Sequence, residues 1–138
     1  IANLDIVKPT NTDKVIRHYS GKNFKLWKLR MGIMPPHPTF YCKKDIYDAV
    51  GEYTNIYRVS SDYEMMVRMF YCQKITFSHL DMTTVKMRSG GESNNGLIGQ
   101  IQQNMEIVDA AQRNNFYTNI FIVACKLPFK LIQFFSRS

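Results

Sequence analysis

Apolar and polar residues alternate in several short segments, and this spacing predicts β-strands. The alternation is clearest over residues 74–80 and continues over 83–88. A shorter strand is predicted over 4–7, where turn-forming residues follow it, and another over 39–42. Residues 12–19 fit either a further strand or one turn of helix.

In other segments apolar residues recur three and four positions apart, and this spacing predicts helices. One helix is predicted over 44–50 with Gly51 as its C-terminal cap, and a second over 62–72. A third, of about four turns, is predicted from 97 to about 114. The segment 24–29, where apolar residues alternate with lysines, fits a strand or a helix.

The order of these elements indicates an α/β fold, or a mixed α+β fold if the chain stands alone, because the strands are few and short. The 138 residues, 45% apolar and 21% charged, are enough to form a globular core. The longest apolar run, 120–125, is far shorter than the ~20 residues that cross a bilayer.

Charge changes the picture, because the formal net charge is +7 and the N-terminal part carries most of the basic excess. Lys22, Lys25, Lys28 and Arg30 fall together without an acidic residue among them. They form either an ordinary solvated face or a patch for nucleic acid, anionic lipid or a phosphorylated substrate. We do not expect a stacking platform for bases here, which argues against nucleic acid.

Three widely spaced cysteines predict free thiols in a reducing compartment, since no disulfide framework is visible. The start of the chain lacks the features of a signal peptide, so we expect a cytoplasmic protein. No two histidines or cysteines have ligand spacing, so no metal site built from this chain alone is predicted.

Asp62 and Glu64 stand at the start of the predicted helix 62–72. The helix dipole and the free backbone amides stabilise an ionised carboxylate there, and an ionised carboxylate is what a general base must be. The alternative is simple helix capping, supported by the spacing of Ser61 and Glu64, which matches a capping box.

His37 lies in the proline-rich turn MPPHPTF, residues 34–40. Pro35 and Pro36 fix the backbone before it, and Pro38 is expected to hold His37 itself in extended geometry. The histidine is therefore either a rigidly presented substrate contact or, as most lone histidines are, a structural residue.

Arg88 opens a glycine-rich loop over residues 89–95, which contains Gly90, Gly91 and Ser93. Glycines let backbone amides approach an anion, and arginine adds paired donors. The loop matches neither a Walker motif nor a dinucleotide-binding motif, so it is either an anion-binding loop or an ordinary flexible one.

Four blocks in this order, residues 34–40, 44–47 before Gly51, 61–68 and 85–94, resemble the family 2 glycosyltransferases. The resemblance is closest to bacterial members that build surface polysaccharide and lipopolysaccharide. It implies a GT-A fold, a Rossmann-like α/β sandwich, of which residues 1–95 match the acceptor-side part. Residues 96–138 would then add C-terminal amphipathic helices.

The resemblance also implies roles for individual residues. Asp62 matches the aspartate that deprotonates the acceptor hydroxyl in an inverting reaction, and Glu64 would support it. His37 and Thr39 fall on the acceptor side of the site. Arg88, Gly90, Gly91 and Ser93 match the mobile loop that closes over the diphosphate. Many relatives place a metal-binding histidine just after this arginine, where this chain has Ser89.

The implied substrates are a nucleotide-sugar donor and a glycan or lipid-linked acceptor, with Mg²⁺ or Mn²⁺ in the parent enzyme. The Asp-x-Asp motif that holds this metal is absent, so the donor half is expected to be missing, in keeping with a start at Ile1. The isolated chain is therefore predicted to be inactive and to bind no metal.

Two further expectations concern surfaces. Residues 118–135, apolar with Lys126 and Lys130 inserted, would either lie on the inner face of the membrane or dock on a partner, and we expect a homodimer. The alternative function is a non-enzymatic basic module that binds anionic lipid or nucleic acid.

Overall fold

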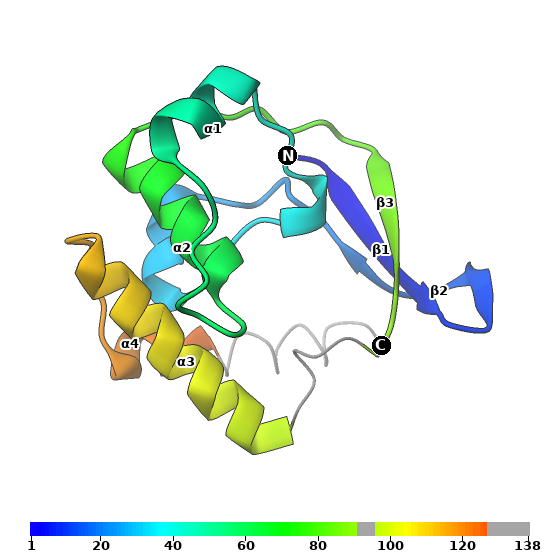
Figure 1. Cartoon of the computed structure of the whole chain (residues 1–138). Helices are drawn as coiled ribbons and strands as arrows, with labels where there is room; N and C mark the ends of the chain where they lie inside the picture. The colour runs from blue at the N-terminus through cyan, green and yellow to red at the C-terminus, as the bar shows by residue number, and fades with distance from the viewer. Residues whose placement is uncertain (91–95, 127–138) are drawn as a thin grey trace.

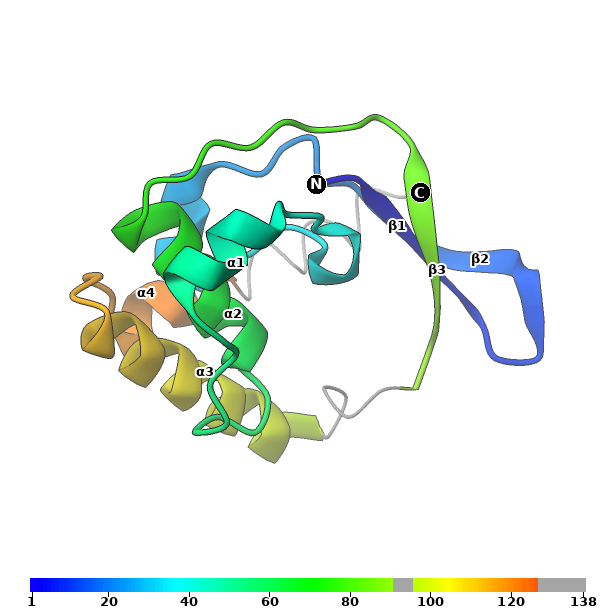
Figure 2. The ribbon, with the colours of Figure 1, turned by 45° about the horizontal axis from the view of Figure 1, so that its top comes forward.

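The computed structural model describes residues 1–90 and 96–126 and has a mixed α/β architecture. A small three-stranded sheet stands at one end, and the described helices gather to one side of it (Figure 1). The hairpin of the first two strands extends away from the helices, as Figure 2 shows.

The sheet has the strand order β2-β1-β3. β1 (Asn3–Lys8) pairs antiparallel with β2 (Asn11–Tyr19) and parallel with β3 (Thr83–Arg88). The predicted strands at 4–7 and 83–88 are confirmed, and the segment 12–19 adopts the strand of its two options. Both β2 and β3 are edge strands within the described part of the chain.

The strand predicted over 74–80 is wrong. This segment crosses from the helices to β3 without pairing in the described sheet, and Lys74 at its start has a positive φ of 51°. Phe77 instead packs against Phe24 and Phe70, with ring centroids 5.4 and 5.3 Å away. Apolar and polar residues alternate wherever an extended chain lays one side on the core. Such a chain does not need a neighbouring strand.

The strand predicted over 39–42 is also wrong, because the chain makes a short 3-10 helix, η2 (His37–Thr39), at this point. The amide of Thr39 donates to the Pro36 carbonyl, at 2.9 Å, and that of Phe40 donates to the His37 carbonyl, at 3.0 Å. His37 therefore stands in a tight turn and not in the extended geometry expected from Pro38.

The remaining elements are helical. Segment 24–29, which fitted two structures, contributes to a 3-10 helix. The helices predicted over 44–50, 62–72 and 97–114 are confirmed, the second ending in a π-helical turn. These elements are η1 (Leu26–Met31), α1 (Lys44–Val50), α2 (Ser61–Val67), η3 (Arg68–Cys72), α3 (Gly96–Arg113) and α4 (Ile120–Ala124).

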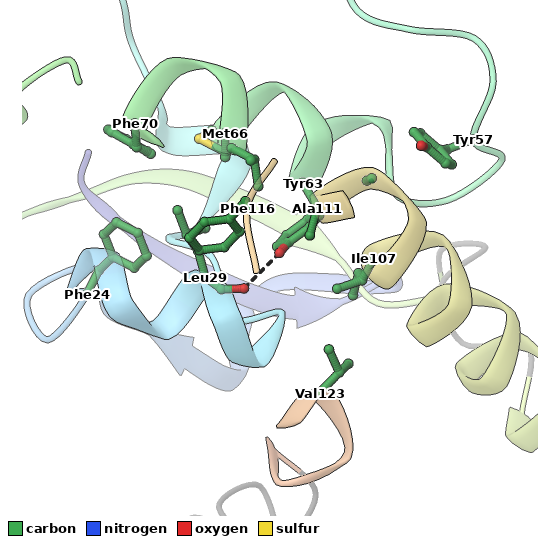
Figure 3. Close-up of a cluster of buried hydrophobic side chains, with 12 residues drawn as sticks. Phe24, Leu29, Tyr57, Tyr63, Met66, Phe70, Ile107, Ala111, Phe116 and Val123 are labelled. Carbon is green, nitrogen blue, oxygen red and sulfur yellow. Dashed lines mark hydrogen bonds between the residues drawn. The ribbon is translucent and has the colours of Figure 1, made fainter. Parts of the chain in front are cut away.

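The core forms where α2 meets η1, α3 and α4 (Figure 3). Tyr63 on α2 is buried, and its hydroxyl donates to the Leu29 carbonyl at 2.8 Å. Ala110 and Ala111, both fully buried, let α3 approach the other helices closely. Residues from both sides of position 95 thus share one core cluster.

The first half of α3 has a different environment from the second. Leu97, Ile98, Ile101 and Met105 are exposed, whereas Ile107 and the two alanines are buried. The apolar face of α3 is therefore covered by other elements over only part of its length in the described structure. None of the described helices combines the length and apolarity that crossing a membrane requires.

Candidate functional site

The structure brings two of the predicted site residues together. His37, at the start of η2, and Asp62, in the first turn of α2, lie close enough that the imidazole lowers the pKa of the carboxyl group. Tyr53, from the loop after α1, packs edge-on against His37, with ring centroids 6.2 Å apart. These three residues define the His37–Asp62–Tyr53 site.

The electrostatics of Asp62 differ from the sequence-based expectation. Burial raises the pKa of the Asp62 carboxyl group, and this outweighs the opposing effects of the Tyr63 amide and of His37. The amide of Tyr63 donates to Asp62 Oδ1 at 2.8 Å. The position at the helix start was expected to favour the ionised form, but desolvation has the larger effect. A carboxylate with a raised pKa is the stronger proton acceptor.

His37 is held by its proline-rich turn. Pro35 and Pro36 are buried, so the backbone on the N-terminal side of the histidine is enclosed as well as conformationally fixed. His37 Nδ1 is buried and has no hydrogen-bond partner among the described residues. A buried polar atom without a partner is costly, and in a native structure it calls for an explanation such as a catalytic role or a bound water.

Tyr53 was missed by the sequence analysis. Burial, a hydrogen bond with the Tyr47 side chain and the charge of Asp62 raise the pKa of Tyr53 to about 12. Its phenol therefore stays protonated, and available as a donor, at any physiological pH. The only local signal is an aromatic residue two positions after the Gly51 cap, which by itself does not indicate a site.

Glu64 lies on a different side of α2 from the His37–Asp62–Tyr53 site. Its carboxylate accepts hydrogen bonds from Arg68 Nε, at 2.8 and 3.0 Å, and from Asn114 Nδ2, at 3.0 Å. Arg68 in turn donates to the carbonyls of Val50 and Glu52, both at 2.7 Å. The pair therefore holds the loop that leads to Tyr53, and any support that Glu64 gives to Asp62 is through this loop.

Thr39 does not face a substrate. Its side chain is fully buried, and its hydroxyl accepts from the Ala2 amide at 3.1 Å and lies within donor distance of the carbonyls of Ala2 and Pro36. These bonds attach η2 to the start of β1. The acceptor-binding role expected for Thr39 is thus replaced by a structural one, because every polar atom of the side chain is already used.

Arg88 ends β3, opposite Val7 of β1. η2 is attached at Ala2, and Arg88 lies beside Val7. At ~3.3 Å per residue of strand, Arg88 is therefore about 17 Å along the sheet from the point where η2 is attached. Gly90 has a φ of 112°, which only glycine adopts readily. Gly91 and Ser93 lie outside the described residues, so the predicted diphosphate loop is described only at its start.

The basic cluster does not form one open patch. Lys22 lies 3.7 Å from Asp81, and Lys28 donates to the Asn23 carbonyl at 2.6 Å. The guanidinium of Arg30 lies over the ring of Phe116 at 5.6 Å. Three of the four cations therefore contact neighbouring groups of the protein, as residues of an ordinary solvated face do.

Metal-ligating residues do not gather in the part of the chain that the structure describes, where no group of three His, Cys, Asp or Glu residues is placed to hold an ion. The three cysteines are free thiols in the structure. Comparison of the chain with protein-family models, with curated proteins and with solved structures finds no match.

Proposed function

We propose that this chain is the acceptor-side part of an inverting glycosyltransferase that transfers a sugar from a nucleotide-sugar to a glycan or lipid-linked acceptor. Two observations support the proposal. The four sequence blocks resemble the acceptor half of family 2 enzymes, and Asp62 is the residue of those blocks that matches the catalytic base. The placement of Asp62 near His37 and Tyr53, where burial raises the pKa of its carboxyl group, is the single observation that carries the chemistry.

In the proposed reaction the acceptor hydroxyl gives its proton to the Asp62 carboxylate as its oxygen attacks the anomeric carbon. The bond from that carbon to the nucleoside diphosphate breaks on the opposite side, and the configuration is inverted. Asp62 supplies general-base catalysis, worth about 10²–10⁴-fold in rate. His37 and Tyr53 hold the attacking hydroxyl and exclude water.

The divalent metal that the resemblance implies does not fit the described part of this chain. Its ligands would have to come from a donor-binding half, since no suitable group of side chains gathers among residues 1–90 and 96–126. The proposed steps therefore involve only residues of this chain, and we propose that the isolated chain has no transfer activity.

The open edges of the sheet support a missing half. β2 and β3 each have one side unpaired in the described structure, and β3 exposes Met87 at 43%. In a larger sheet a further strand would cover such an edge. The exposed apolar residues of α3 and Phe121 of α4 would likewise support self-association or contact with the cytoplasmic face of a membrane.

The test uses the full-length protein that contains these 138 residues, assayed with a panel of nucleotide-sugars and with soluble and lipid-linked glycans. Asp62→Asn should lower kcat by about 10²–10⁴-fold, since the proton acceptor is lost while the shape is kept. Asp13→Asn, on the exposed hairpin, is the matched control and should keep full activity.

Three results would overturn the proposal: a wild-type rate for Asp62→Asn, retention of anomeric configuration in the product, or no transfer from any donor. Transfer by the isolated chain that Asp62→Asn abolishes would overturn the assignment of donor binding to a separate half.

A further inference from the structure

A hollow opens at the C-terminal end of α1, beside the His37–Asp62–Tyr53 site. Its walls are Tyr47, Asp48, Gly51, Glu52 and Tyr53, and its volume is about 620 Å³. The hollow is open to solvent, and a space of this volume has room for a sugar ring laid against its walls.

The walls combine two kinds of side chain. Tyr47 and Tyr53 offer aromatic surface, which packs well against the C–H face of a pyranose ring. Glu52 offers a carboxylate able to accept hydrogen bonds from two neighbouring hydroxyls, and the Asp48 oxygens, which accept from Lys44 Nζ at 2.9 and 2.7 Å, have lone pairs left for a further donor. Aromatic faces with carboxylates around them suit an uncharged polyhydroxyl ring and disfavour an anionic one.

Tyr53 connects the hollow to the proposed base. The same side chain lines the hollow, packs against His37 and lies close enough to Asp62 for the carboxylate charge to raise its pKa. A ring seated against Tyr53 would therefore present a hydroxyl toward Asp62. The hydrophobic core does not require Tyr53 at this position, since its side chain is 44% exposed.

The loop that forms the hollow is held in place before any ligand arrives. Arg68 donates to the carbonyls of Val50 and Glu52, and the Gly51 amide donates to the Tyr47 carbonyl at 2.8 Å. Lys44 Nζ forms an ion pair with Asp48 at 2.7 Å, which fixes that carboxylate at the rim. A preformed loop reduces the entropy lost on binding.

From these contacts we infer that the hollow is the acceptor subsite and that it takes a neutral pyranose, stacked on Tyr47 and Tyr53 and hydrogen-bonded by Asp48 and Glu52. The inference rests on the proposed function and deepens it, because it names the class of acceptor. An acceptor sugar that carries a carboxylate is disfavoured by Glu52 and by Asp48, whose charge the ion pair with Lys44 offsets only in part.

The test is a titration of the 138-residue chain, followed by the NMR shifts of backbone amides. The probes are methyl glucoside, lactose and methyl glucuronide, the last matching glucoside except for its carboxylate. The neutral sugars should shift the amides of residues 47–53 with Kd values of about 1–10 mM, at the weak end of the affinity scale. The glucuronide should bind at least tenfold more weakly.

Variants separate stacking from charge. Tyr53→Ala should weaken binding of the neutral sugars at least fivefold, whereas Tyr53→Phe, which keeps the ring, should change it less than twofold. Tyr117→Ala, at an exposed tyrosine outside the hollow, is the matched control and should leave binding unchanged. The double variant Asp48→Asn with Glu52→Gln should remove the discrimination against glucuronide.

The inference is overturned if the neutral sugars shift no amides of 47–53, if glucuronide binds as well as glucoside, or if Tyr53→Ala binds as the wild type does. This failure can be told apart from failure of the proposed function. Asp62-dependent transfer without sugar binding in the hollow would overturn the assignment of the subsite and leave the proposed function standing. Sugar binding there without transfer by the full-length protein would remove the glycosyltransferase proposal and leave the binding site.

Discussion

The two sides of α2 carry carboxylates only two positions apart, and these carboxylates have opposite environments. Glu64 is closed within a network with Arg68 and Asn114. Asp62 accepts a hydrogen bond from the Tyr63 amide of the same helix and has His37 nearby. Burial raises the pKa of its carboxyl group. The difference teaches that a helix start does not decide what an acidic residue does; the groups that neighbouring elements bring to it decide.

The largest expected effect comes from removing the partner of Glu64. Arg68→Met should lower the free energy of unfolding by about 3 kcal/mol, because it leaves a carboxylate that is only 10% exposed without its cation. It also removes both bonds to the loop after α1. Urea denaturation measures the change.

Lys44→Met is the matched control, since Lys44 and Asp48 form an ion pair with the same spacing on an exposed surface. It should cost about 0.5 kcal/mol or less. Equal losses in the free energy of unfolding for Arg68→Met and Lys44→Met would show that the ion pair of Glu64 contributes no more than an exposed ion pair does. Adding Glu64→Gln to Arg68→Met should restore part of the loss.

A smaller effect is expected at Glu106, on α3, whose carboxylate accepts from the amides of Arg58, Val59 and Ser60 at 3.3, 3.0 and 3.0 Å. Burial alone would raise the pKa of Glu106, but the bonds from Val59, Gln102, Ser60 and Arg58 bring it below its usual value. Glu106→Gln should therefore cost about 1–2 kcal/mol at neutral pH.

The sign of the pH dependence follows from the lowered pKa. Stability from Glu106 is fully present above the unfolded-state pKa of about 4.3 and is lost as the pH falls through the lower folded-state pKa. The difference between wild type and Glu106→Gln should shrink over that range, measured by thermal unfolding at pH 7 and at pH 3. Glu52→Gln, at an exposed glutamate, is the matched control for the loss of one carboxylate.

The smallest effect has the opposite sign. Asp62→Asn should stabilise the fold at pH 7 by about 0.5–1 kcal/mol, or about 2–5 °C in Tm, because it removes a carboxylate that burial makes costly to ionise. The gain should appear as the pH rises above the unfolded-state value near 3.9 and vanish below it. A destabilised Asp62→Asn protein, with Asp13→Asn unchanged, would place Asp62 among the structural carboxylates.

Much of the fold follows from periodicity. The helices over 44–50 and 97–114 and the strands over 4–7 and 83–88 were predictable because each has a strong local pattern. The error at 39–42 comes from the 3-10 turn of η2, whereas the segment 74–80 has no pairing strand in the described sheet. Whether an extended segment becomes a strand depends on a partner with unsatisfied backbone groups, and that partner is not encoded locally.

The candidate site was predictable only in part. His37 and Asp62 could be named from a rigid proline turn and a helix start, and the structure places them near each other. Tyr53 could not be named, since its role depends on the packing of the loop after α1 against η2. Thr39 was misjudged because its neighbours in sequence say nothing of its bonds to Ala2.

Asn3 ties β1 to residues far along the chain, and this has a consequence for how the molecule folds. Its side chain contacts His79 and Asp81, 76 and 78 positions away. Closing a loop of that length costs about 4 kcal/mol of chain entropy. The hairpin of β1 and β2 can form early from near neighbours, but β3 has to wait until the helices between have drawn the chain together. The sheet thus depends on the helices for its assembly, although it begins first in the sequence.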